Sequence, residues 1–192
     1  MDKVKIENAA LNIYTEHIKR GTPAKSLAKI IKAESLWFSE IKSDSNSFLG
    51  ALVKVPDYPP HIIVRNNITP SGRKNFTIAH ELGHYILGHN LYNTSIFCNN
   101  INEEDETISK QENEANYFAR CFLLPHDRII KEFTNWFRYR VSQTSNVFLK
   151  IETQGSKWQL WKAVSGNLTK KFAVSEITLK IRLIELKLIN NF

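Results

Sequence analysis

Residues 76–84, with the sequence FTIAHELGH, constrain this chain more than any other segment. On an α-helix, side chains four positions apart differ by about 40° around the axis, so His80 and His84 share one face and can bind one metal ion. Glu81 is offset from that face and is not expected to bind the metal. A carboxylate in that position can take a proton from a metal-activated water, and zinc lowers the pKa of such a water to about 7.

The surroundings of the motif predict a buried helix. Ile78, Leu82 and Ile86 form an apolar stripe at helical spacing. Gly83 is less favourable than alanine inside a helix by about 1 kcal/mol, so we expect another element to pack closely against it. The motif is short enough to arise by chance in unrelated chains. The alternative to a metal site is a buried helix whose histidines only form hydrogen bonds.

A catalytic zinc ion takes three protein ligands and keeps one open position, so a third ligand must follow the motif. The metzincin pattern needs a glycine and a histidine where Leu87 and Asn90 stand, and a methionine turn, whereas the only methionine is Met1. That pattern is therefore excluded. His89 lies about 140° from His84 around the axis of an unbroken helix, and we expect a surface or capping histidine there rather than a ligand.

A glutamate on a second helix, predicted over residues 111–120, is the remaining source of a third ligand. Glu114 directly precedes Ala115 at the edge of the apolar face of that helix, and it is our first choice. Glu112 lies about 200° away around the axis and is expected to face solvent, unless the helix is rotated and the two exchange places. Alternatively, Glu114 is an ordinary solvent-exposed glutamate that binds no metal.

Three ordered blocks of the sequence resemble the ImmA/IrrE family of metallopeptidases. They are residues 76–84, residues 114–119 closed by Leu-Leu-Pro at 123–125, and residues 172–176 with the apolar positions that follow them. The resemblance extends over about residues 49–188. It implies a gluzincin-like zinc peptidase, often paired with a helix-turn-helix transcriptional repressor that the peptidase inactivates by cleavage.

Composition indicates a globular protein with one domain, or one domain and a small appendage. The chain has 192 residues, of which 42% are hydrophobic and 23% are charged. No run of 18 apolar residues predicts a membrane-spanning helix, and the N-terminal segment lacks the apolar core of a signal peptide. Because Cys98 and Cys121 cannot form a disulfide framework, we expect two free thiols in the cytoplasm.

The net charge of +7 is unevenly placed along the chain. Residues 1–125 contain 14 basic and 14 acidic residues, whereas residues 126–192 contain 12 basic and 5 acidic residues. A basic C-terminal third could bind nucleic acid or the acidic surface of a protein partner. A solvated surface explains the charge equally well, and direct nucleic-acid binding is not favoured.

We predict a mostly helical α+β fold. A zincin-like metallopeptidase core over residues 1–125 begins with helices near 6–18 and 23–31, and a basic helical region follows over 126–192. A small sheet is expected between the first helices and the motif, from runs at 36–41, 48–55 and 61–64. One of its edge strands would pair with an extended peptide beside the cleft, and the sequence leaves open which strand does so.

The C-terminal region departs from the family pattern. A helix over 128–141, capped by Asp127, precedes an insertion around 142–167 that lacks a familiar motif. Aromatic residues interleave with lysines there, which is typical of single-stranded nucleic-acid binding or of a minor core, and we favour the core. A last helix, capped by Ser175, looks like half of a helix-turn-helix, but we expect it to pack rather than to read DNA. Its expected core residues are Ile177, Ile181, Ile184 and Leu188.

The sequence favours a cytoplasmic zinc-dependent endopeptidase in which His80, His84 and Glu114 bind zinc and Glu81 is the general base. By resemblance, its partner is a helix-turn-helix repressor. The alternative is a zinc-containing regulator that binds a repressor or DNA without cutting, and a toxin acting on another protein is a third possibility. The donor that stabilises the oxyanion stays open among Tyr85, Tyr117, His61 and His126.

Overall fold

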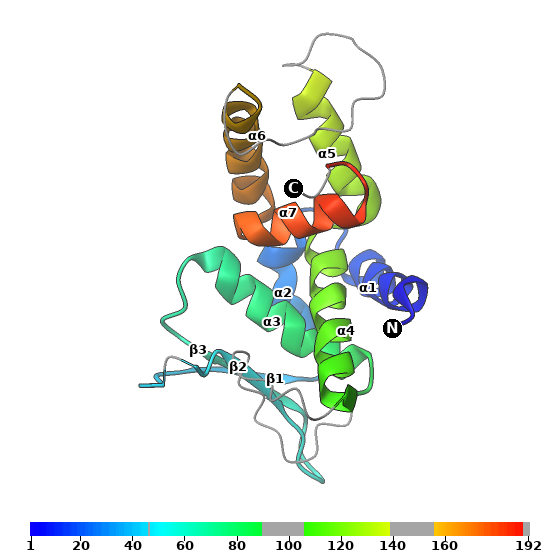
Figure 1. The fold of residues 1–192 in the computed structure, drawn as a ribbon. Coiled ribbons are helices and arrows are strands. Elements are labelled where there is room, and N and C mark those ends of the chain that lie inside the picture. The colour runs from blue at the N-terminus through cyan, green and yellow to red at the C-terminus, as the bar shows by residue number, and fades with distance from the viewer. Residues whose placement is uncertain (46, 90–105, 139–155, 190–192) are drawn as a thin grey trace.

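The computed structural model of the chain describes residues 1–45, 47–89, 106–138 and 156–189. Within these ranges it contains seven helices and three strands (Figure 1). In chain order they are α1 (Lys3–His17), α2 (Pro23–Ala33), β1 (Trp37–Ile41), β2 (Gly50–Val53), β3 (His61–Arg65), α3 (Ser71–Ile86), α4 (Glu106–Leu123), α5 (His126–Arg138), α6 (Ser156–Phe172) and α7 (Glu176–Glu185). The predicted mostly helical α+β class with a small sheet in the N-terminal half is confirmed.

The three strands form one sheet in the order β1-β3-β2, so β1 and β2 are its edges. β1 runs parallel to β3, with Trp37 opposite His61. β2 runs antiparallel to β3, with Gly50 opposite Val64. Figure 1 shows the sheet below α3, whereas α5, α6 and α7 lie at the opposite end of the molecule. The site motif on α3 therefore lies between the sheet and the helical C-terminal region.

The close packing of α3 against α4 depends on a glycine in the motif helix. A methyl group at Gly83 would lie 2.9 Å from Cδ1 of the Phe118 ring, which is closer than carbon atoms normally approach. Phe118 itself is fully buried. Gly83 thus allows α4 to approach α3, and the expectation of a close neighbour at this position is confirmed.

The last helix, α7, begins where the sequence predicts but buries a different face. The Ser175 side chain accepts a hydrogen bond of 3.1 Å from the backbone N–H of Thr178 and caps the helix. The expectation that Ile177 and Ile181 enter a core is wrong, since they are 72% and 38% exposed. Ile184 and Leu188, also expected in the core, do pack against it in partly buried positions. The inward face carries Arg182 together with fully buried leucines.

Arg182 explains the orientation of α7. Its side chain is 1% exposed, donates to the carbonyl oxygen of Leu124 at 3.2 Å and forms an ion pair with Glu7. These contacts join α7 to the end of α4 and to α1. Because a buried charge is costly unless it is paired and hydrogen-bonded, the partners of Arg182 determine which side of α7 faces inward.

Helix α6 occupies part of the predicted insertion and was not foreseen from the sequence. Trp161 on α6 is buried in the hydrophobic core, and its Nε1 donates to Glu176 Oε1 at 2.8 Å. The connection between α6 and α7 lies against the start of α3, where Asn75 Nδ2 donates to the carbonyl oxygen of Ala173 at 2.8 Å. The favoured core role is confirmed for Trp161, and residues 142–155 of the predicted insertion lie outside the described residues.

The start of α5, the cysteines and the helix lengths can also be compared with the sequence-based expectations. Helix α5 begins at His126, so Asp127 lies in its first turn and is not the residue before the helix. Cys121 is a buried free thiol, and Cys98 lies outside the described residues. Within the described ranges, no helix combines the length and the apolar character needed to span a membrane.

Candidate metal centre

Helix α3 carries the two histidines and the glutamate of the motif in the core of the protein. His80, Glu81 and His84 are 3%, 2% and 0% exposed. The Nε2 atoms of His80 and His84 lie 2.9 Å apart, so both rings direct this nitrogen toward one place. The two rings share one helix face, as the four-residue spacing predicts.

Glu112 on α4 completes a cluster of three possible ligands. Its Oε2 lies 3.2 Å from His80 Nε2, and its Oε1 lies 3.0 Å from His84 Nε2. One ligand atom from each of the three residues lies within 4.8 Å of the other two, and all three residues are buried. Two imidazole nitrogens and one carboxylate oxygen at this separation could hold a metal ion.

Glu114, the first choice from the sequence, is not part of this cluster. Its Oε2 lies 3.3 Å from His89 Nε2, and its Oε1 lies 4.0 Å from the amino group of Met1. The reason is the rotation of α4 about its axis. Glu112 lies about 20° from the fully buried Ala119 around the helix, so its side chain faces α3. The structure therefore brings Glu112 rather than Glu114 to the two histidines, which is the exchange that a rotated helix would produce.

The remaining ring nitrogens of both histidines also have partners. His80 Nδ1 lies 3.0 Å from Asn116 Oδ1 on α4, and His84 Nδ1 lies 2.9 Å from His89 Nδ1. His89 is 6% exposed and is therefore not a surface histidine, but its backbone N–H donates to the carbonyl oxygen of His84 at 3.0 Å and so caps the end of α3. The expectation of a surface position assumed an unbroken helix, whereas α3 ends at Ile86 and the chain turns before His89.

The charges within the cluster suit a cation. Burial alone would raise the pKa of Glu112, but the facing rings of His80 and His84 lower it to about 2. Burial lowers the pKa of His84 to about 4, so this ring is neutral at pH 7. Although Glu112 Oε1 is close to His84, it accepts no hydrogen bond of suitable geometry from any residue that the structure describes. A buried carboxylate oxygen without a hydrogen bond, beside two imidazoles, fits a metal ion.

Glu81 lies next to the cluster without joining it. Burial raises the pKa of Glu81 to about 7, although the nearby His80 and a hydrogen bond from the backbone of Leu52 act in the opposite direction. Its Oε1 is buried and finds no hydrogen-bond partner in the described part of the chain. Gly50 on β2 approaches so closely that a methyl group there would lie 3.3 Å from Glu81 Oε1. The edge strand β2 is thus the strand nearest to this carboxylate.

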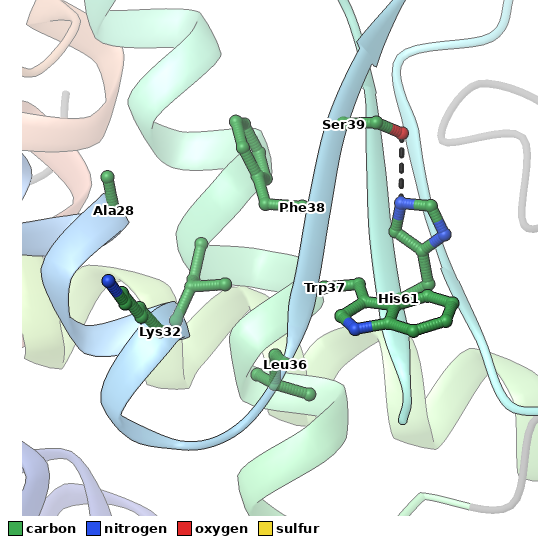
Figure 2. A pocket seen from close by; sticks show the side chains of 8 residues that line it. Ala28, Lys32, Leu36, Trp37, Phe38, Ser39 and His61 are labelled. Atoms are coloured by element: carbon green, nitrogen blue, oxygen red, sulfur yellow. Dashed lines mark hydrogen bonds between the residues drawn. The ribbon is translucent and has the colours of Figure 1, made fainter. Parts of the chain in front are cut away.

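His61, one of the candidate oxyanion donors, lines a groove together with residues of α2 and β1. The groove has a volume of about 440 Å³. Figure 2 shows the His61 ring beside Trp37, with a hydrogen bond of 2.9 Å between its Nε2 and Ser39 Oγ. The contacts that the structure gives His61 are therefore made within the sheet, where it pairs with its neighbours on β1.

Two further oxyanion candidates also have partners of their own. The Tyr117 hydroxyl donates to Glu7 Oε2 at 3.4 Å. His126 Nδ1 lies 2.9 Å from Asp127 Oδ1 at the start of α5, and both side chains are exposed. Tyr85 follows His84 directly and packs against the core in a partly buried position, so the choice of donor stays open.

The sequence profile of the IrrE N-terminal-like domain of peptidase family M78 matches residues 41–183, about three quarters of the chain. The chain belongs to this family. The ImmA/IrrE resemblance noted from three sequence blocks is thereby confirmed. No curated protein matches the sequence of this IrrE-like chain.

A solved structure with a similar fold is a Mycobacterium tuberculosis transcriptional regulator. The two chains are 20% identical with a TM-score of 0.55, and the match covers 94% of the IrrE-like chain and 46% of the mycobacterial chain. This likeness concerns the fold. The IrrE-like chain therefore spans about half the length of that regulator.

Proposed function

We propose that this IrrE-like chain is a zinc-dependent endopeptidase in which His80, His84 and Glu112 bind the metal and Glu81 is the general base. The observation that carries the proposal is the convergence of three ligand atoms within 4.8 Å, beside a buried carboxylate that stays apart from them. Two histidines and a glutamate are a known ligand set of catalytic zinc sites, which leave one position open. Bound zinc would lower the pKa of a water and polarise a peptide carbonyl.

Glu81 is suited to moving protons near neutral pH. With a pKa of about 7, it is ionised in a large fraction of molecules at pH 7 and can accept a proton from the attacking water. In its protonated form it can then donate that proton to the leaving amine. The hydrogen bond from Leu52 holds the carboxylate in place beside the histidine pair.

The outer edge of β2 is the proposed docking site for the substrate backbone. Among the described residues, β2 pairs with β3 on one side only, and the Leu52 N–H on its other side reaches Glu81. An extended peptide can add to such an edge through backbone hydrogen bonds, which demand little of the side chains. This arrangement would place a peptide bond near the general base.

The proposed substrate is a helix-turn-helix transcriptional repressor in the cytoplasm, and cleavage would relieve repression. This part of the proposal is supported by the family resemblance. The basic residues over 126–192 account for the whole net charge, and we propose that this region docks an acidic surface of the partner while residues 1–125 form the peptidase core.

Incubation of purified repressor with zinc-loaded protein tests the proposal. We expect the wild type to cut the repressor and the Glu81→Gln variant to retain zinc but lose cleavage, because only the proton carrier is removed. Glu16→Gln, the same chemical change on the exposed face of α1, is the matched control and should cut normally. Cleavage by Glu81→Gln at the wild-type rate would remove Glu81 from its role.

The second candidate is a regulator that binds the repressor without cutting it. The observation that favours it is the deep burial of the site, since none of His80, Glu81, His84 and Glu112 is more than 3% exposed. A repressor that stays full length while transcription is switched on in cells would support the regulator. A steep salt dependence of binding to duplex DNA would instead support direct contact with nucleic acid.

A further inference from the structure

A chain of three side chains extends outward from the proposed metal cluster through His84. His84 Nδ1 lies 2.9 Å from His89 Nδ1, and His89 Nε2 lies 3.3 Å from Glu114 Oε2. His84 and His89 are 0% and 6% exposed, so water does not compete freely for these contacts. His89 and Glu114 are not among the three possible ligands His80, His84 and Glu112.

The end of α3 holds His89 in this position. Gly88 adopts a left-handed conformation with a φ of 69°, which residues with a side chain rarely adopt. This turn brings the His89 backbone N–H to the carbonyl oxygen of His84 at 3.0 Å, and its own carbonyl oxygen accepts a hydrogen bond of 3.0 Å from Lys54 Nζ. The backbone turn after α3 therefore places the His89 ring against the ring of His84.

Hydrogen-bond chemistry allows one arrangement of protons that leaves His84 able to bind a metal. A neutral imidazole has one N–H donor and one acceptor nitrogen, and a metal needs the lone pair of His84 Nε2. The His84 proton must then be on Nδ1 and be donated to His89 Nδ1. His89 must in turn have its proton on Nε2, where it faces the carboxylate of Glu114. The reverse direction would place the His84 proton on Nε2 and block the ligand position.

We propose that His89 and Glu114 are positioning residues that fix the metal-binding tautomer and ring orientation of His84. This inference rests on the proposed function, since it requires His84 to be a metal ligand. A carboxylate at the end of such a chain favours the required direction, because it can only accept a hydrogen bond. Loss of partners of this kind typically costs about tenfold to a hundredfold in metal affinity.

Zinc affinity of the full chain, measured by competition with a chromophoric chelator, tests this role. We expect His89→Ala to weaken zinc binding by about tenfold to a hundredfold. His89→Asn should restore most of the affinity, because its amide oxygen can accept the proton of His84 Nδ1, whereas the apolar His89→Leu should not. Glu114→Gln keeps an acceptor oxygen and should bind more tightly than Glu114→Ala.

Two controls separate positioning from general damage to the fold. His126→Ala removes an exposed histidine on α5, and Asn113→Ala changes an exposed position on α4, so both should bind zinc as the wild type does. The visible absorption of bound cobalt provides a second readout. It should change in His89→Ala and return toward the wild-type spectrum in His89→Asn, because these bands report the geometry of the ligands.

The possible outcomes are distinct for the two proposals. If His89→Ala and His89→Leu bind zinc as tightly as the wild type, the positioning role is overturned while the metal site stands. If His89→Asn binds as weakly as His89→Leu, the hydrogen bond is not the cause of the effect, and the positioning role is again overturned. If the wild type itself binds no zinc, both proposals fail together.

Discussion

Replacement of Glu81 by glutamine should stabilise the metal-free protein, and the gain should grow with pH. Glu81 is 2% exposed, and one of its carboxylate oxygens has no hydrogen-bond partner within the described ranges. Burial raises its pKa from 4.5 to about 7 in the folded protein. The folded state therefore disfavours the ionised carboxylate, whereas the unfolded chain ionises it freely.

The size of the effect follows from this pKa difference. At 1.36 kcal/mol per pKa unit, the ionisation of Glu81 costs the folded state about 3 kcal/mol at pH 8 and about 1 kcal/mol at pH 5. Because folding raises the pKa of this acid, Glu81 costs the folded protein no stability below pH 4.5. The free energy of unfolding then falls as the pH rises through 7, where the buried carboxyl group must ionise. Glutamine does not titrate and avoids this loss.

Urea unfolding in the presence of a chelator, at several pH values between 5 and 8, measures the difference. We expect the free energy of unfolding of Glu81→Gln, relative to the wild type, to increase by about 2 kcal/mol across this range. The change with pH is the readout, because any constant cost of burying the amide cancels. Glu16→Gln, at an exposed position, should show no such trend. A difference in unfolding free energy between Glu81→Gln and the wild type that stays flat from pH 5 to 8 would contradict a raised pKa of Glu81 in the folded protein.

Three further predictions concern packing, a buried ion pair and metal binding. Gly83→Ala should lower the free energy of unfolding by about 1–2 kcal/mol despite its better helix propensity, because the new methyl group meets the Phe118 ring; urea unfolding tests this. Arg182→Met should cost about 1–2 kcal/mol in the same assay, since the Leu124 carbonyl and Glu7 lose their buried hydrogen-bond donor, and an unchanged midpoint would contradict it. Zinc at a thousandfold excess over its dissociation constant should stabilise the wild type by about 4 kcal/mol, seen as a raised melting temperature, but not His80→Ala.

Much of the fold could be predicted because local patterns determine it. The apolar spacing of α3 and α4, the proline that ends α4 and the serine that caps α7 are all visible in the sequence. The buried face of α7 was not predictable in the same way. Ile177 and Ile181 have the expected spacing, but pairing of Arg182 with Glu7, far away in the chain, turns the helix differently.

The candidate site shows the same division between local and distant information. His80 and His84 are related by helix geometry alone, so their convergence follows from the sequence. The choice between Glu112 and Glu114 depends on the rotation of α4, which the packing of Phe118 against Gly83 helps to set. A usable signal was present, because Glu112 precedes the buried positions of α4 by three and seven residues and so shares their face.

His89 could not be placed from helical periodicity, because the helix that carries the motif ends before it. The signal was Gly88, whose left-handed conformation is typical of a helix C-terminus. Reading that glycine as the end of α3 would have shown that His89 turns back rather than continuing around the axis. Its contact with His84 is therefore a property of the turn.

Metal content per chain, measured in the wild type, Glu112→Ala and Glu114→Ala after loading with excess zinc and removal of the free ion, tests whether Glu112 is the third ligand. We expect about one zinc ion per chain in the wild type and almost none in Glu112→Ala, because that variant loses one of three ligands. Glu114→Ala should still take up zinc to the same stoichiometry when the ion is supplied in excess. Full zinc content in Glu112→Ala, or none in the wild type, would contradict a site built from His80, His84 and Glu112.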